Sequence, residues 1–139
     1  MGSSVYQYLA KVVRVVDGDT LDLRVDLGFT ASVKVRVRLH GVNTPEMHGV
    51  KKDSDEYKAG DAARRYVLSW LDKDQARRID EGDPDAEWGL VKVRSFDGKK
   101  LGTGKYGRWI VIVERPDPIP DTPLNMMLVQ NGHAEEVRY

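Results

Sequence analysis

The sequence contains no cysteine, no long hydrophobic run and no excess of charge of either sign. The absence of cysteine excludes a disulfide scaffold and a zinc site built on thiolates. No apolar run reaches the ~20 residues that a membrane-spanning helix needs. Residues 1–7 lack the basic and apolar regions of a signal peptide. We therefore expect either a cytoplasmic or phage-encoded protein or the mature form of a secreted one.

Basic and acidic side chains are equal in number, at 22 each, which argues against a protein that coats DNA through its overall charge. Their distribution is uneven. Residues 1–52 carry a net charge of +3 and residues 91–115 carry +5, whereas residues 53–90 carry −5 and residues 116–139 carry −3. A local basic groove in a neutral protein is typical of a phosphate-binding surface. The alternative is a solvated face with scattered charges.

The N-terminal half shows the period-two alternation of β-strands. Residues 10–16 are rich in β-branched side chains, and residues 20–27 and 33–39 alternate apolar with charged residues. The pair Asp17-Gly18 is a hairpin turn signal. These segments predict an antiparallel meander of three strands, and the length of 139 residues predicts one domain spanning residues 1–139.

The rest of the chain alternates helical and strand patterns. Apolar residues at three- and four-residue spacing predict a helix over residues 55–71, with Ser54 or Asp55 as its cap. Residues 73–87 are polar and acidic, which predicts a surface loop with little structure of its own. Two further strands are predicted at 88–96 and 109–113.

A short C-terminal helix is predicted over residues 122–130, ended by Asn131-Gly132. The fold class is therefore α+β, mainly β. Five strands, with a helix between the third and the fourth and a short C-terminal helix, match an OB-fold Greek-key barrel. This fold alone does not define a function.

Three short segments carry the polar residues that indicate chemistry. Residues 16–20 read VDGDT, residues 38–46 read RLHGVNTPE, and residues 105–108 read KYGR. Carboxylate and amide oxygens are ligands for hard cations such as Ca²⁺. Arginine binds phosphate oxygens bidentately and stays charged at ordinary pH. Together these residue types are what phosphodiester hydrolysis needs.

In order and spacing, the three segments resemble the staphylococcal nuclease (thermonuclease) family, and the resemblance extends from about Lys11 to about Glu136. It implies hydrolysis of DNA and RNA with little sequence preference, leaving 3′-phosphates. It also implies three sets of site residues. These are Arg38, Glu46 and Arg108 for catalysis, Asp19, Asn43 and Thr44 for the metal, and Lys105 and Tyr106 for a flanking phosphate.

In this resemblance, Glu46 is the general base that holds or deprotonates the attacking water. Arg38 and Arg108 stabilise the charge of the transition state. Thr44 contributes its backbone carbonyl to the metal. Asp17 is interpreted as a turn former, since aspartate in a hairpin commonly bonds its own backbone.

The sequence departs from the family at two places. Asn43 stands where the family has an aspartate, so one ligand charge is missing. The expected cofactor is Ca²⁺, with Mg²⁺ or Mn²⁺ as alternatives because of this asparagine. Arg138 falls where the family has the first tyrosine of its nucleotide pocket, which leaves the base preference open.

Two other functions remain as alternatives. One is a catalytically silent OB-type module that binds nucleic acid or a protein, and the other is a pure protein-interaction domain. Family members that lack catalysis have lost the arginines or the glutamate, whereas this chain keeps Arg38, Glu46 and Arg108. The expected partner is therefore a DNA or RNA substrate, and the expected oligomeric state is a monomer.

Overall fold

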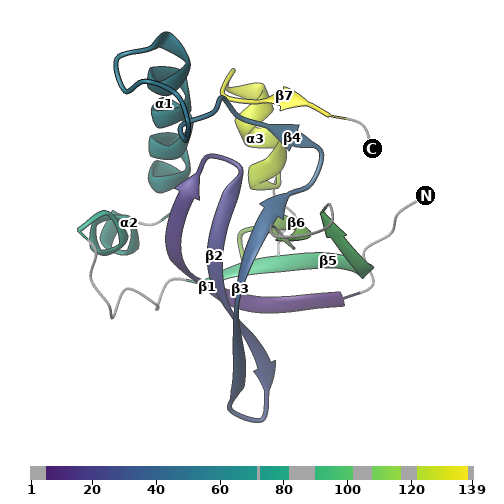
Figure 1. The fold of residues 1–139 in the computed structure, drawn as a ribbon. Helices are drawn as coiled ribbons and strands as arrows, with labels where there is room; N and C mark the ends of the chain where they lie inside the picture. The colour runs from purple at the N-terminus through teal and green to yellow at the C-terminus, as the bar shows by residue number, and fades with distance from the viewer. Residues whose placement is uncertain (1–5, 72, 82–89, 102–107, 117–121, 138–139) are drawn as a thin grey trace.

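The structure is a computed structural model that describes residues 6–71, 73–81, 90–101, 108–116 and 122–137. Five strands form a closed barrel in the order β1-β2-β3-β6-β5. Figure 1 shows these strands crossing one another in the lower half of the view. The barrel strands are β1 (Tyr6–Asp17), β2 (Thr20–Gly28), β3 (Ala31–Leu39), β5 (Leu90–Leu101) and β6 (Arg108–Glu114). This arrangement confirms the predicted five-stranded, OB-like barrel.

All the pairings within the barrel are antiparallel except one. Strands β3 and β6 pair in parallel, with Val37 opposite Trp109 and Leu39 opposite Val111. This pairing closes the barrel between segments that lie far apart in the sequence. It also brings the end of β3 beside the start of β6, where two of the predicted site residues lie.

Two helices lie between the third and the fourth barrel strand. The first, α1 (Asp55–Trp70), begins after Ser54, whose side chain accepts a hydrogen bond from the backbone N–H of Tyr57. This confirms the predicted helix and one of its two candidate caps. The second, α2 (Lys73–Asp80), was not predicted. The prediction of a loop over residues 73–87 is therefore wrong for its first half.

The missed helix has a simple physical origin. Its composition is almost wholly polar, and Ile79, which is 7 % exposed, is its one buried large apolar residue in the hydrophobic core cluster. A single apolar position gives no periodicity that would distinguish a helix from a loop. Packing against α1 and β1 holds this helix in place.

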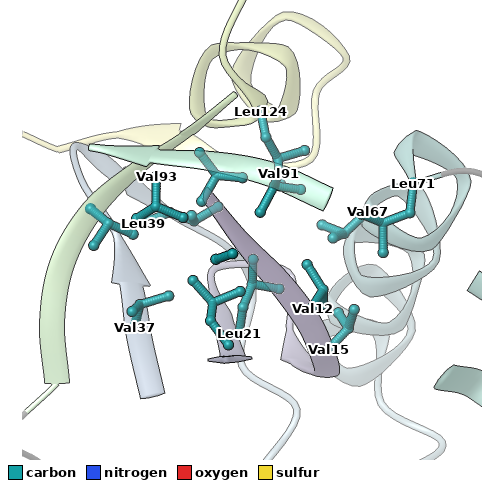
Figure 2. Packing of buried hydrophobic residues seen from close by; sticks show 14 of the residues in the cluster. Val12, Val15, Leu21, Val37, Leu39, Val67, Leu71, Val91, Val93 and Leu124 are labelled. Carbon is teal, nitrogen blue, oxygen red and sulfur yellow. The ribbon is translucent and has the colours of Figure 1, made fainter. Parts of the chain in front are cut away.

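The core fills the barrel and continues under the helices. Leu21, Leu23 and Val25 alternate inward along β2. Figure 2 shows buried side chains from the barrel and α1 meeting in one cluster. The labelled members are Val12, Val15, Leu21, Val37, Leu39, Val67, Leu71, Val91, Val93 and Leu124. Because each strand uses one face for this core, its other residues face outward.

The C-terminal helix α3 (Leu124–Gln130) confirms the predicted final helix. The buried side chain of Asn125 fixes it to the barrel. Its Oδ1 accepts a hydrogen bond from Val113 N over 3.1 Å, and its Nδ2 donates to His40 O over 2.9 Å. No helix in the described part of the chain is long and apolar enough to cross a membrane.

A second, two-stranded sheet pairs β4 (Val42–Asn43) with β7 (Glu135–Glu136). The sequence analysis missed both strands, since two residues are too few to show a period. Val137 N also donates to Gly41 O over 2.8 Å. The segment after α3 is thus bonded to the segment that holds Asn43, one of the predicted site residues.

Candidate functional site

The predicted site residues that the structure describes lie in one pocket at the helical end of the barrel, where the β1–β2 turn, the segment after β4 and the start of β6 meet. The pocket has a volume of about 710 Å³. Six predicted residues line it, namely Asp19, Arg38, Asn43, Thr44, Glu46 and Arg108. The other two, Lys105 and Tyr106, lie outside the described residues.

Asp19 forms the floor of this pocket and is only 4 % exposed. Its Oδ1 accepts a hydrogen bond from the Thr20 hydroxyl over 3.0 Å, and its Oδ2 accepts one from the backbone N–H of Thr44 over 3.0 Å. The bond to Thr44 joins the β1–β2 turn to the segment after β4.

Arg38 lies at the end of β3 and links the acidic floor to the amide of Asn43. One guanidinium nitrogen, Nη1, forms an ion pair with Asp19 Oδ2. The other, Nη2, donates to Asn43 Oδ1 over 2.8 Å and to Val42 O over 3.2 Å. The third nitrogen, Nε, is buried and has no hydrogen-bond partner among the described residues.

Arg108 begins β6 and approaches the same floor from the other side. Its Nη1 donates to the Thr20 hydroxyl over 3.4 Å, and that hydroxyl donates onward to Asp19. The parallel pairing of β3 with β6 carries Arg108 to the neighbourhood of Arg38. Two arginines that were 70 positions apart in the sequence thus line one pocket.

Helix α1 packs tightly against the segment that carries Glu46. A Cβ placed on Gly60 would lie 2.7 Å from Pro45 O and 3.3 Å from Glu46 O. Gly18 makes a similar approach from the β1–β2 turn, where a Cβ would lie 2.8 Å from Ala63 Cβ. Such distances leave no room for a methyl group. The two glycines therefore let the helix, the turn and the Glu46 segment pack together.

Glu46 is exposed at the mouth of the pocket, and a neighbouring residue orients its carboxylate. The backbone N–H of His48 donates to Glu46 Oε1 over 3.2 Å. The His48 ring reaches the end of β1, where its Nε2 lies 3.1 Å from Asp17 Oδ1. Asp17 is therefore more than a turn former, because it also lines the pocket and contacts the Glu46 segment.

Burial raises the pKa of Asp17 above its ordinary value of 3.8. The nearby negative charges of Asp19 and Glu46 raise it further, whereas the contact with His48 lowers it. Three carboxylates around one pocket repel one another. A bound cation or a cationic side chain would relieve this repulsion.

The oxygen donors of this pocket fit a hard divalent cation, although their charge is low. Asp19 supplies a carboxylate and Asn43 an amide oxygen, both of which such cations accept. The hydroxyl of Thr44 is buried and has no hydrogen-bond partner among the described residues, so it is a further donor. In the described part of the chain, no three His, Cys, Asp or Glu side chains are grouped as a metal site. A cation bound in this pocket would therefore depend on amide, hydroxyl and carbonyl oxygens.

Two arginines of the pocket were not singled out by the sequence analysis. Arg14 on β1 and Arg36 on β3 both line it. Arg36 forms a bidentate pair with Asp22, with Nε to Oδ1 at 2.7 Å and Nη2 to Oδ2 at 3.0 Å. The alternation of β3 put Arg36 on the same face as Arg38, which was the available signal. Placing Arg14 in the pocket requires the pairing register between β1 and β2, which the sequence does not give.

Comparisons with known proteins do not assign the chain to a family. No protein-family profile matches it, and no curated protein sequence matches it significantly.

Proposed function

We propose that this protein is a metal-dependent nuclease of the staphylococcal nuclease type, which hydrolyses phosphodiester bonds in DNA and RNA. The observation that carries the proposal is the convergence of Arg38, Arg108, Asp19 and Glu46 on one pocket. These four residues come from three segments of the chain, and they are the ones that the family resemblance singles out.

In this proposal the scissile phosphate binds between the two arginines. Arg38 lines the pocket from the end of β3, and Arg108 lines it from the start of β6. Fixed guanidinium groups stabilise the charge that develops on phosphorus, which is usually the largest catalytic contribution. Since phosphate contacts carry little sequence information, we expect weak sequence preference.

Glu46 lies at the pocket mouth, where it can hold a water molecule beside the phosphate. Its Oε1 is oriented by the His48 N–H, which leaves Oε2 to accept a proton from that water. A carboxylate in this role is a general base. A cation bound to Asp19, Asn43 and Thr44 would neutralise the phosphate; Ca²⁺ is the first candidate, followed by Mg²⁺ or Mn²⁺.

The test is digestion of single-stranded DNA in Ca²⁺, in Mg²⁺ and in EDTA, with Glu46→Gln beside the parent protein. We expect cleavage in metal that leaves 3′-phosphate ends and falls by roughly 10²- to 10⁴-fold in the variant. Thermal melting of both proteins verifies that the variant is folded. Equal cleavage by parent and variant would remove Glu46 from the mechanism.

The second candidate is a silent module that binds nucleic acid without cleaving it. The specific observation in its favour is that Arg38 contacts Asp19 and Asn43 directly, so that a guanidinium occupies the oxygens a cation would use. DNA binding without cleavage in any metal would support this candidate and overturn the hydrolase.

A further inference from the structure

The outer face of strands β1, β2 and β3 is unusually basic. Along β2, Leu21 and Leu23 face the core, so Asp22 and Arg24 face outward. On β3 the same alternation turns Lys34 and Arg36 outward. This face continues from the pocket towards the β2–β3 hairpin, which projects away from α1 and α3 in Figure 1.

The strand register aligns these outward residues in rows. Arg14 lies opposite Asp22, which in turn lies opposite Arg36. In the next row, Lys11 lies opposite Arg24, and Arg24 lies opposite Lys34. The two rows contain five basic residues and a single acid. We call the five residues the cationic strip; they are Lys11, Arg14, Arg24, Lys34 and Arg36.

The cationic strip is continuous with the pocket. Two of its members, Arg14 and Arg36, line the pocket wall. Arg36 is two residues from Arg38 on the same face of β3. The strip ends at the following row, where Asp26 lies opposite Ser32. The formal charge is +1 for the row of Arg14, Asp22 and Arg36 and +3 for the row of Lys11, Arg24 and Lys34.

We propose that the cationic strip binds the sugar-phosphate backbone of a polynucleotide that continues beyond the scissile phosphate. The inference rests on the proposed function, because it takes the pocket as the place where that phosphate binds. Successive rows are two residues apart, which is about 7 Å at a strand rise of ~3.4 Å per residue. This matches the separation of successive phosphates along an extended single strand, so each row can meet one phosphate.

Asp22 holds the guanidinium of Arg36 in one orientation, with part of it open to solvent. Its pairing with Asp22 uses Nε and Nη2, which leaves the Nη1 edge of the guanidinium directed away from that carboxylate. The Arg36 side chain is 49 % exposed. No described residue forms an ion pair with Lys34 or Arg14, and both side chains are exposed. These side chains are therefore accessible to phosphates in solution.

The experiment measures binding rather than cleavage. A fluorescent single-stranded oligonucleotide of about 16 nucleotides, the upper end of the site size of one OB-fold, is titrated in EDTA. The salt concentration is varied from about 50 to 200 mM. The proteins are the parent, Lys34→Gln, the double variant Arg14→Gln/Lys34→Gln, and Arg65→Gln. The last is the matched control, because Arg65 lies on α1 with its side chain 73 % exposed.

Each lost phosphate contact reduces the slope of log K against log salt by ~0.7 for a single strand. We expect reductions of about 0.7 and about 1.4 for the single and double variants, with the control equal to the parent. Slopes that equal the parent's in both variants would overturn the inference. So would equal binding of polyglutamate, which offers the charge without the nucleotide geometry.

The outcomes for the two proposals can be separated. A parent protein that binds the oligonucleotide with the expected slopes but cleaves nothing in any metal overturns the hydrolase and supports the strip. A parent that cleaves DNA but whose variants bind with unchanged slopes supports the hydrolase and overturns the strip. Lys34 is exposed, so Lys34→Gln is not expected to unfold the protein.

Discussion

Arg38 donates a hydrogen bond from Nη2 to the side-chain oxygen of Asn43 over 2.8 Å, and the same guanidinium pairs with Asp19. A residue proposed to bind phosphate thus contacts two residues proposed to bind a cation. With asparagine at position 43, this contact is a charge–dipole hydrogen bond. An aspartate there would make it a second ion pair and would also add a ligand charge. In the proposed function, position 43 would therefore set the balance between the guanidinium and a cation.

The first prediction concerns this balance. Asn43→Asp should tighten Ca²⁺ binding by roughly tenfold, because cation affinity increases with ligand charge. Asn43→Ala should weaken it. Isothermal titration calorimetry measures both without relying on activity. Unchanged or weaker affinity in Asn43→Asp would mean that the new carboxylate pairs with Arg38 and that no cation competes with it.

The second prediction concerns the stability of the pocket floor. Arg38→Gln leaves the buried carboxylate of Asp19 without its ion-pair partner, which should cost about 3 kcal/mol of unfolding free energy. Urea denaturation measures this loss. The double variant Arg38→Gln/Asp19→Asn should recover most of it, because the uncompensated charge is removed. Failure of the second substitution to restore stability would show that the ion pair contributes little.

The third prediction separates Arg108 from Arg38. Arg108 donates a long hydrogen bond of 3.4 Å to the Thr20 hydroxyl, and lysine keeps the positive charge and a donor, so Arg108→Lys should leave the melting temperature close to that of the parent. It should nevertheless lower kcat by roughly 10²-fold, since lysine cannot reproduce a bidentate contact to a developing charge. Steady-state kinetics on DNA tests this. A change confined to KM would assign Arg108 to substrate binding alone.

The fourth prediction uses the contact between α1 and the Glu46 segment. In a free helix Gly→Ala stabilises by ~1 kcal/mol, but at Gly60 the added methyl would meet Pro45 O at 2.7 Å. We therefore expect Gly60→Ala to destabilise by about 1 to 3 kcal/mol, the usual cost of overpacking. It should also lower activity by displacing Glu46. A higher melting temperature would contradict this packing.

The fifth prediction follows from the raised pKa of Asp17. A carboxyl whose pKa is higher in the folded state binds its proton more tightly there. Its stabilising contribution is present below pH 3.8 and is lost as the pH rises through the folded value. Asp17→Asn should thus stabilise the protein at neutral pH, with the advantage disappearing towards pH 3.8. Urea denaturation across this range tests the sign. A destabilised variant at neutral pH would mean that the His48 contact outweighs burial.

Much of the fold was predictable because its strands and helices carry strong periodic signals. The alternation along residues 20–27 and 33–39 identified β2 and β3, and Ser54 was one of two caps expected for α1. The predictions failed where contacts between distant segments, and not local periodicity, determine the structure. Helix α2 has too few apolar residues to show a period, and β4 and β7 are two residues long.

The candidate site was predictable only in part. The motif residues Asp19, Arg38 and Arg108 were expected together, and they do line one pocket. Their roles stay predictions, and Lys105 and Tyr106 lie outside the described residues. Sequence reasoning could not find the Arg38–Asn43 bond, because it depends on how β4 turns back towards β3. It also could not place Arg14 beside Asp22, since that needs the register across a bulge in β1.

The parallel pairing of β3 with β6 has a consequence for biogenesis. It joins residues about 70 positions apart, so it forms only after most of the chain has left the ribosome. Long-range contacts of this kind are slow to form, because the intervening chain must first be ordered. Arg38 and Arg108 line one pocket only once this pairing has formed. A chain that ends before β6 would therefore lack the paired arginines of the pocket.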